Sequence, residues 1–154
     1  MPRILLPLIS ILYLSPIFGQ FTDSFNDGNF SANPSWTSVS GDFIIDDSEL
    51  RSNKEDATSF GINTLLGSNI SIWNFSFKLS FNPSSANYVH VFLSSDSLVE
   101  NSQNGYYVKI GNTNDEISLY RLSNGISTEI ISGTDDLLDK SSSAFDVSVE
   151  YKKD

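Results

Sequence analysis

Six residues in the second half of the chain carry aromatic rings or polar head groups at alternate positions of three predicted strands. They are Tyr88, His90 and Phe92 in the first strand, Tyr107 and Lys109 in the second, and Tyr120 in the third. Because successive side chains of a strand point to opposite faces, each lies on the face opposite its apolar neighbours. Rings with polar edges suit the flat faces of sugars. These six are therefore the candidate ligand-binding residues, and a neutral glycan or a surface protein is the predicted partner.

The same aromatic face has a second interpretation. A large apolar patch usually marks something that covers it, such as another sheet, a loop or a further part of the protein. In that case the face is structural and binds nothing small. Both interpretations require the three strands to be neighbours in one sheet.

Catalysis by this chain is not predicted. Glu116, in the segment DEISLYR, is the best-placed acid, but the positions that would supply its partner hold Ser118 and Arg121. A retaining glycosidase needs two carboxyl groups roughly 5 Å apart. The chain has one histidine and no cysteine, which argues against nucleophilic triads and zinc sites with several imidazole or thiolate ligands. The alternative to a binding role for His90 is that of an ordinary hydrogen-bonded residue of the sheet.

A polar segment near the N-terminus is the candidate metal site. Asp23, Asn26, Asp27 and Asn29 surround Gly28 and offer the hard oxygen ligands that calcium prefers. The alternative is an ordinary polar turn, in which Asp and Asn side chains bond their own backbone. No cofactor is predicted beyond this structural calcium ion.

Strict alternation of apolar and polar residues predicts the strands that position these groups. It is clearest in 73–81, where every second residue is large and apolar, and it recurs in 88–93, 106–110, 128–131 and 145–151. A further strand begins with Ile117 and Leu119 and ends at Ser123-Asn124-Gly125, which is a strong hairpin signal. Shorter strands are predicted around Ser24 and Phe25, at 43–45 and 49–51, and near 57–62. No segment has apolar residues at helical spacing for three turns. We therefore predict an all-β, antiparallel β-sandwich of the jelly-roll type, with a barrel as the alternative.

The first 19 residues are predicted to be a cleaved secretory signal, and residues 20–154 one sandwich domain. Arg3 supplies a positive start, and the apolar run 4–18 contains Pro7 and Pro16. This run is shorter than the roughly 20 residues that a membrane span needs. An uncleaved anchor is the alternative. The prediction is a secreted or cell-surface protein without membrane insertion after signal cleavage.

The net charge and the absence of cysteine limit the possible binding partners and the cellular compartment of the protein. The net charge of −10 falls to about −11 when Arg3 is removed. A surface without a basic patch argues against nucleic acid and anionic lipid as partners. The chain has no cysteine, which excludes a bacterial lipid anchor at the cleavage point and differs from small disulfide-bonded secreted domains. A bacterial exported protein fits these observations.

The alternating strand 145–151 comes just before the final residue, Asp154. A folded protein normally covers such an edge strand. We therefore expect this sandwich to lack its last strand or strands.

Four segments resemble the N-terminal region of exported Bacteroidetes surface proteins, whose later parts often carry a lamin-tail domain and a sorting tail. The segments are FTDSFNDGNFSANPSW at 21–36, FKLSFNPSSANYVHVFLSSD at 77–96, GYYVKIG at 105–111 and DEISLYR at 115–121. The resemblance implies a concanavalin-like or laminin-G-like jelly roll at the front of a large cell-surface protein, and no defined activity. The sequence departs from this pattern by ending early, before the downstream domains.

Taken together, these observations predict a secreted, non-catalytic β-sandwich module for cell-surface adhesion or carbohydrate recognition. The alternative is a purely structural N-terminal domain of a larger surface protein. A fragment of a glycoside hydrolase is less favoured, since fold alone implies little about activity.

Overall fold

The computed structural model describes residues 21–39, 41–55, 59–66, 70–97, 102–138 and 144–152. The predicted signal segment 1–19 lies outside these residues. Within the described ranges the chain forms ten strands and no helix, and every strand pairing is antiparallel. The chain divides into two compact units, Met1–Asn69 and Ile70–Asp154.

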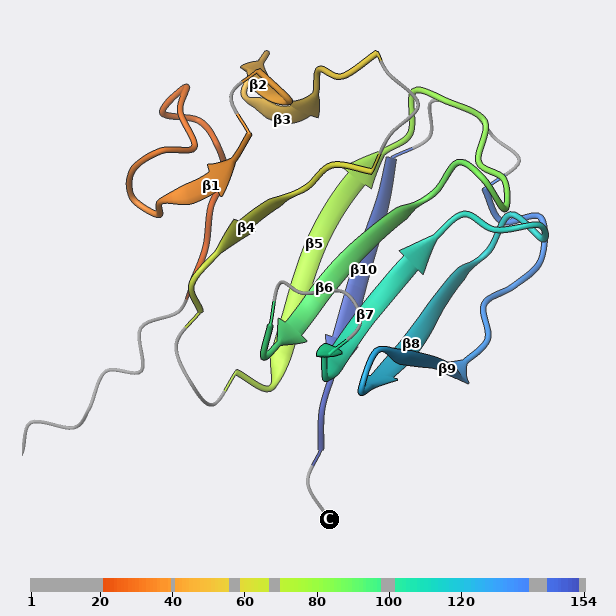
Figure 1. Cartoon of the computed structure of the whole chain (residues 1–154). Coiled ribbons are helices and arrows are strands. Elements are labelled where there is room, and N and C mark those ends of the chain that lie inside the picture. The colour runs from red at the N-terminus through yellow and green to blue at the C-terminus, as the bar shows by residue number, and fades with distance from the viewer. Residues whose placement is uncertain are drawn as a thin grey trace, which may run out of the picture. The chain divides into compact units, whose positions relative to one another are not determined.

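The first unit contains two short strand pairs (Figure 1). One joins β1 (Trp36–Ser38) to β4 (Ile62–Thr64), and the other is the hairpin of β2 (Phe43–Asp46) and β3 (Glu49–Ser52). The strand predicted around Ser24 and Phe25 is wrong, because Phe25 has a left-handed φ of 55°. Its backbone N–H bonds the carboxylate of Asp23 instead of a neighbouring strand. The strand predicted near 57–62 begins only at Ile62, and Ala57 lies outside the described residues.

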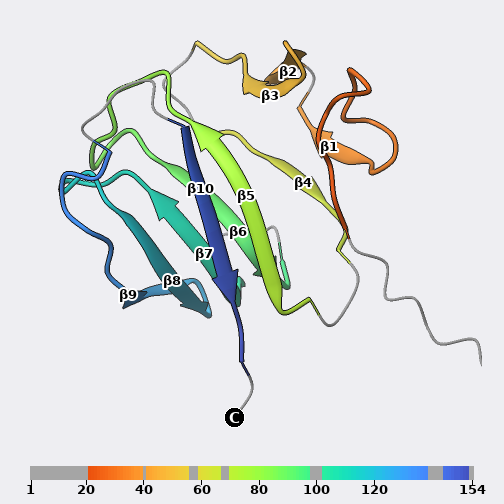
Figure 2. The ribbon, with the colours of Figure 1, turned by 180° about the vertical axis from the view of Figure 1, so that it is seen from behind.

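The second unit is a two-layer sandwich (Figures 1 and 2). One layer is a four-stranded meander, and the other is a single strand pair that lies across one face of it. The meander comprises β6 (Val89–Ser95), β7 (Gly105–Ile110), β8 (Ile117–Ser123) and β9 (Ile126–Ile131), and the pair comprises β5 (Ile72–Lys78) and β10 (Ala144–Glu150).

The core of the second unit lies between these layers. Its buried members are Leu79, Leu93, Val108, Ile110 and Leu138. The half-buried apolar residues of β5 and β10 pack against them, and Phe77 stacks on Phe145 with ring centroids 5.3 Å apart. The alternating patterns of 73–81 and 145–151 thus place one side of each strand in this core. The predicted all-β antiparallel sandwich is confirmed, while its jelly-roll topology and the single domain 20–154 stay predictions.

Two local features set the register of the meander. The predicted turn at Asn124-Gly125 joins β8 to β9, and both residues have the left-handed φ values, 50° and 75°, that such a hairpin requires. In β6 the pairing with β7 shifts by one residue between Phe92 and Ser94. Such a bulge re-aims the side chains on either side of it.

Candidate functional site

The structure brings all six candidate ligand-binding residues together. In the register of the meander, Lys109 is opposite His90, and Tyr107 is opposite both Phe92 and Tyr120. Tyr88 directly precedes β6. Val91, Val108 and Leu119, which have the opposite parity, pack in the core. The six residues therefore share the face of the meander that points away from β5 and β10, which we call the aromatic face.

The rings of the aromatic face form a continuous series of contacts across three strands. Tyr88 stacks on His90 with centroids 4.9 Å apart, and His90 lies 4.4 Å from Tyr107. Phe92 is 5.3 Å from Tyr107, and Tyr120 stacks on Tyr107 at 5.2 Å with an interplanar angle of 10°. Tyr88 and Phe92 are 44% and 41% exposed, whereas Tyr107 is 5% exposed. The outer rings are thus open to solvent and the central ring is held by its neighbours.

A chain of polar contacts borders these rings. The Lys109 ammonium group lies 4.5 Å from the centroid of the Tyr88 ring and donates a hydrogen bond to Asn112 Oδ1 at 3.2 Å. Asn112 Nδ2 in turn donates to Glu116 Oε1 at 2.9 Å. Glu116 is only 5% exposed, and its other oxygen, Oε2, is buried without a hydrogen-bond partner among the described residues.

A second polar pair lies at the β9 side of the face. Tyr120 donates a hydrogen bond to Glu129 Oε2 at 2.7 Å. Burial raises the pKa of the Tyr120 phenol, and the hydrogen bond to Glu129 adds to this shift. The same hydrogen bond lowers the pKa of Glu129. Nearby, the hydroxyl groups of Tyr107 and Ser127 share a hydrogen bond. The phenol therefore stays protonated and the carboxylate ionised at neutral pH.

His90 is neutral on this face. Part of its ring is exposed, but loss of hydration among the neighbouring rings lowers its pKa from 6.5 to about 4. The positive charge of Lys109 contributes to the same shift. The imidazole thus acts at neutral pH as a flat ring with one donor and one acceptor nitrogen.

Four polar residues of this face were not predicted from the sequence. They are Asn112, Ser127, Glu129 and, in a binding role, Glu116. Glu116 directly precedes β8 and has the same parity as Tyr120, so its place on this face could have been predicted from the alternating pattern. Glu129 is opposite Tyr120 in the continuous register that runs back from the Asn124-Gly125 turn, and the β8–β9 register shifts only beyond this pair, between Tyr120 and Leu119. This pairing could therefore have been predicted from the turn. Asn112 lies in the turn after β7, where the period-two pattern no longer applies.

The candidate calcium residues bond their own segment instead. Asp23 accepts hydrogen bonds from Phe25 N and from Trp36 Nε1, both at 2.8 Å. Asp27 accepts from the backbone and side-chain nitrogens of Asn29 at 3.2 and 2.8 Å. Asn29 Oδ1 accepts from the backbone N–H groups of Ser31 and Ala32. Asn26 is exposed in the same segment. Within the described ranges, no group of three or more His, Cys, Asp or Glu could hold a metal ion, and the calcium ion stays a prediction.

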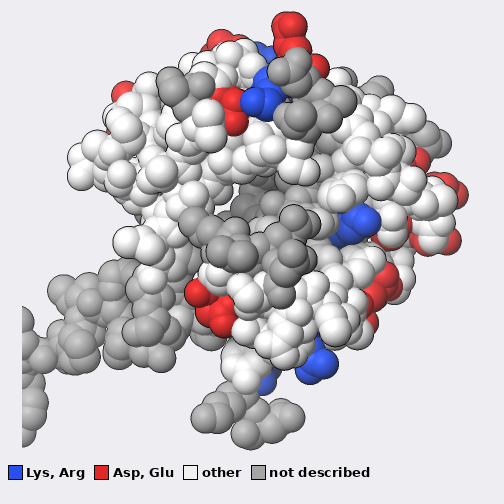
Figure 3. Space-filling view, viewed as in Figure 1, with Lys and Arg blue, Asp and Glu red and all other residues white. Residues whose placement is uncertain are grey.

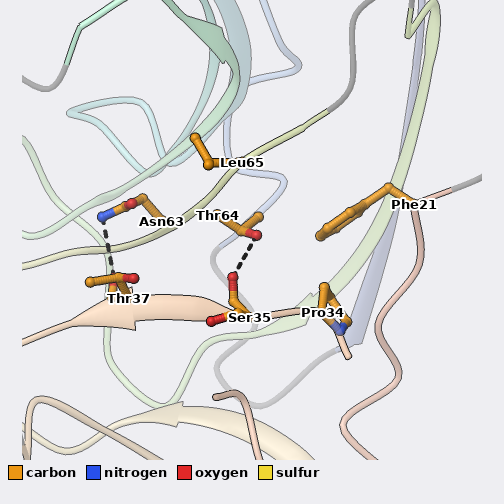
Figure 4. Close-up of a pocket in the computed structure, with 7 residues that line it drawn as sticks. All are labelled: Phe21, Pro34, Ser35, Thr37, Asn63, Thr64 and Leu65. Atoms are coloured by element: carbon orange, nitrogen blue, oxygen red, sulfur yellow. Dashed lines mark hydrogen bonds between the residues drawn. The ribbon is translucent and has the colours of Figure 1, made fainter. Parts of the chain in front are cut away.

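A cleft of about 340 Å³ lies in the first unit (Figure 4). Its walls are held by hydrogen bonds from Thr64 Oγ1 to the carbonyl oxygen of Ser35, at 2.8 Å, and from Asn63 Nδ2 to that of Thr37, at 3.2 Å. The lining residues are Phe21, Pro34, Ser35, Thr37, Asn63, Thr64 and Leu65. None of them titrates or could act as a general acid or base, so the cleft offers no catalytic group.

A second cavity, of about 250 Å³, lies between the two layers of the second unit. It opens beside β10, and most of its lining is apolar, with Ile117, Leu119, Ile131, Val147 and Val149 among its walls. We call it the inter-sheet groove.

The surface charges form no basic patch among the described residues in view (Figure 3). Comparison with protein-family models, with curated proteins and with solved structures gives no match. No helix long and apolar enough to cross a membrane occurs in the described part of the chain.

Proposed function

We propose that this protein is an exported, non-catalytic β-sandwich module that binds neutral carbohydrate on its aromatic face. The observation that carries the proposal is the unbroken series of ring contacts from Tyr88 to Tyr120 across β6, β7 and β8. Sugar rings stack on such surfaces through their C–H faces, while their hydroxyl groups need donors and acceptors at the border. Lys109, Tyr120 and Glu129 provide these groups.

Export and a cell-surface location are part of the same proposal. Their support is the signal-like segment 1–19 and the resemblance of 21–36, 77–96, 105–111 and 115–121 to exported Bacteroidetes surface proteins. A module of this kind serves adhesion by holding its parent protein on a glycan-covered surface. The acidic chain disfavours nucleic acid and anionic lipid as partners.

A glycosidase is the alternative that one observation favours. Glu116 and Glu129 are both close enough to Tyr120 to raise its pKa, so the face holds two carboxylates. A glycosidase of this type needs one carboxylic acid with a raised pKa to protonate the leaving group. The pKa of Glu129 is instead lowered by its hydrogen bond to Tyr120. Recognition without catalysis therefore agrees better with the charges.

Removal of single exposed rings tests the proposal. The wild-type protein should bind at least one neutral polysaccharide in an affinity gel or a glycan array. Tyr88→Ala and Phe92→Ala should each weaken this binding about tenfold, since a ring at the centre of a contact contributes more than about 1 kcal/mol. Tyr151→Ala is the matched control, because Tyr151 is 56% exposed and lies outside the aromatic face.

Two results would contradict the proposal. One is the absence of binding by the wild-type protein to every neutral glycan tested. The other is equal binding by the wild type, Tyr88→Ala and Phe92→Ala. Hydrolysis of a bound glucan that is lost in Glu116→Gln would support the glycosidase instead.

A further inference from the structure

The border of the aromatic face contains a donor and an acceptor linked through a single amide. Asn112 accepts a hydrogen bond from Lys109 and donates one to Glu116. These contacts fix the orientation of the Asn112 amide, because its oxygen must face the ammonium group and its nitrogen the carboxylate. Lys109 is in turn held over the Tyr88 ring. The three side chains therefore form one pre-ordered unit beside the rings, which we call the polar chain.

Glu116 is the unusual member of the polar chain. A buried carboxylate normally has hydrogen-bond donors at both oxygens, because an unsatisfied buried oxygen loses its hydration without compensation. Here Oε1 is bonded to Asn112, and Oε2 has no donor among the residues that the structure describes. Glu116 has the same parity as Tyr120 along the chain and accepts a hydrogen bond from Asn112, which places its carboxylate at the border of the aromatic face. An oxygen of this kind can accept a further hydrogen bond, from a water molecule or from a ligand.

Resting on the carbohydrate-binding function proposed above, we infer that the polar chain binds two neighbouring hydroxyl groups of one sugar ring. Lys109 donates to the first hydroxyl group, and Glu116 Oε2 accepts from the second after the side chains that bury this oxygen have moved aside. A hydroxyl group can both accept and donate, so a vicinal pair matches one ammonium and one carboxylate. Asn112 is the positioning residue that keeps the two at a fixed separation.

The charges around the polar chain select a neutral ligand. Glu116 and Glu129 disfavour the carboxylate of an acidic sugar, and Lys109 disfavours the ammonium group of an amino sugar. A neutral sugar brings no charge that must be removed from water. A site that hydrogen-bonds a hydroxyl group discriminates strongly against the analogue without it, because its own polar groups are then left unpaired.

The experiment is competition by small sugars for binding of the protein to immobilised neutral polysaccharide. The competitors are methyl glucoside, galactoside and mannoside, their monodeoxy derivatives, glucuronic acid and glucosamine. For the wild type, we expect at least one neutral glycoside to compete, and removal of either of two adjacent hydroxyl groups to weaken competition tenfold or more. Both charged sugars should compete at least tenfold less well than that neutral glycoside.

The variants assign each hydroxyl group to its partner. Glu116→Gln should lose discrimination at one of the two hydroxyl positions, and Lys109→Met at the other. Glu150→Gln and Lys78→Met make the same charge changes on β10 and β5 and should behave as the wild type. Lys109 is only half-buried, so Lys109→Met tests the inference even if Glu116→Gln unfolds.

The outcomes separate this inference from the proposed function. If Tyr88→Ala and Phe92→Ala lose binding while Glu116→Gln and Lys109→Met discriminate as the wild type does, the inference is wrong and carbohydrate binding stands. If the wild type binds no neutral polysaccharide, both are wrong. Preferred competition by glucuronic acid or glucosamine also overturns the inference.

Discussion

At the scale of single residues, the aromatic face was predicted from the sequence, whereas its polar border was missed although part of it could have been predicted. Side-chain alternation is a local property, so the parity of Tyr88, His90 and Phe92 follows from the pattern within one strand. The contact of Tyr120 with Glu129 also follows from local sequence, because the register counted back from the Asn124-Gly125 turn places the two residues opposite each other without a shift. Asn112 acts from a turn, where no periodicity applies.

The first prediction concerns His90. Its imidazole should titrate near pH 4 in the folded protein, which NMR of the ring can measure directly. Since this pKa lies below the ordinary 6.5, the unfolded chain binds the proton more readily, and folding favours the neutral ring. His90 should therefore cost no stability above pH 6.5 and should lower stability progressively as the pH falls from 6.5 to 4.

Comparison with His90→Gln isolates this effect from the titration of the carboxylates. Relative to that variant, the urea midpoint of the wild type should fall between pH 6.5 and 4 and then stay level. A ring that titrates near 6.5, or a constant difference between the two proteins, contradicts the prediction.

At the scale of elements, the longer strands and their faces were predicted well, whereas two of the short N-terminal strands and the irregular segments were not. The core faces of β5 and β10 match the alternation of their sequences. The segment after β9 gave no such signal, although Leu138 within it is 1% exposed and belongs to the core cluster. Its position depends on backbone hydrogen bonds from Asp136 N to the carbonyl oxygen of Asn114 and from Leu138 N to that of Asp115, which are long-range contacts.

Leu138→Ala should therefore destabilise the second unit by about 2–5 kcal/mol, the usual cost of a cavity at a fully buried leucine. The adjacent Leu137 is 41% exposed, and Leu137→Ala should change stability by less than about 1 kcal/mol. Chemical denaturation of both variants gives the comparison. Similar losses in the two would show that this segment does not anchor the core.

Gly105 offers a second test at the level of the strands. A methyl group there would collide with the backbone carbonyl group of Ser94, next to the β6 bulge, and Gly105 also has a φ of 157°. Gly105→Ala should cost about 1–3 kcal/mol or more, because the backbone must move to accommodate it. Gly61→Ala is the control, since a methyl group at Gly61 meets nothing within 4 Å. Thermal unfolding measures both, and equal midpoints contradict the prediction.

At the scale of the whole molecule, charge opposes the association that exposed apolar surface would favour. Among the described strands, β10 pairs only with β5, and the inter-sheet groove opens beside it. Ile131, in the wall of this groove, is 60% exposed. An unpaired strand edge next to apolar surface is a template for pairing with another chain. The net charge of −10 keeps copies apart at low ionic strength.

Salt should therefore promote self-association. Raising the ionic strength from about 0.01 M to about 1 M shortens the screening length from roughly 30 Å to roughly 3 Å and weakens the repulsion between copies. Sedimentation velocity should show larger species at the higher salt concentration. Ile131→Lys should suppress them, because a lysine beside the edge opposes pairing. Leu65→Lys adds the same charge at a residue that is 95% exposed in the first unit, and it should suppress them less.

The pairing of β5 with β10 also sets an order for folding. Each strand of the meander pairs with its neighbour in sequence. β5 instead pairs with β10, which is far away in the sequence, and Ile72 is thereby placed opposite Glu150. Loop closure makes the distant pairing slower, so the meander can form before the second layer closes. Until β10 has been synthesised, β5 lacks its strand partner. This strand carries the large aromatic residues Trp73, Phe75 and Phe77. The interval between the synthesis of β5 and that of β10 is therefore the period in which the nascent chain is most open to wrong strand pairing and to capture by chaperones.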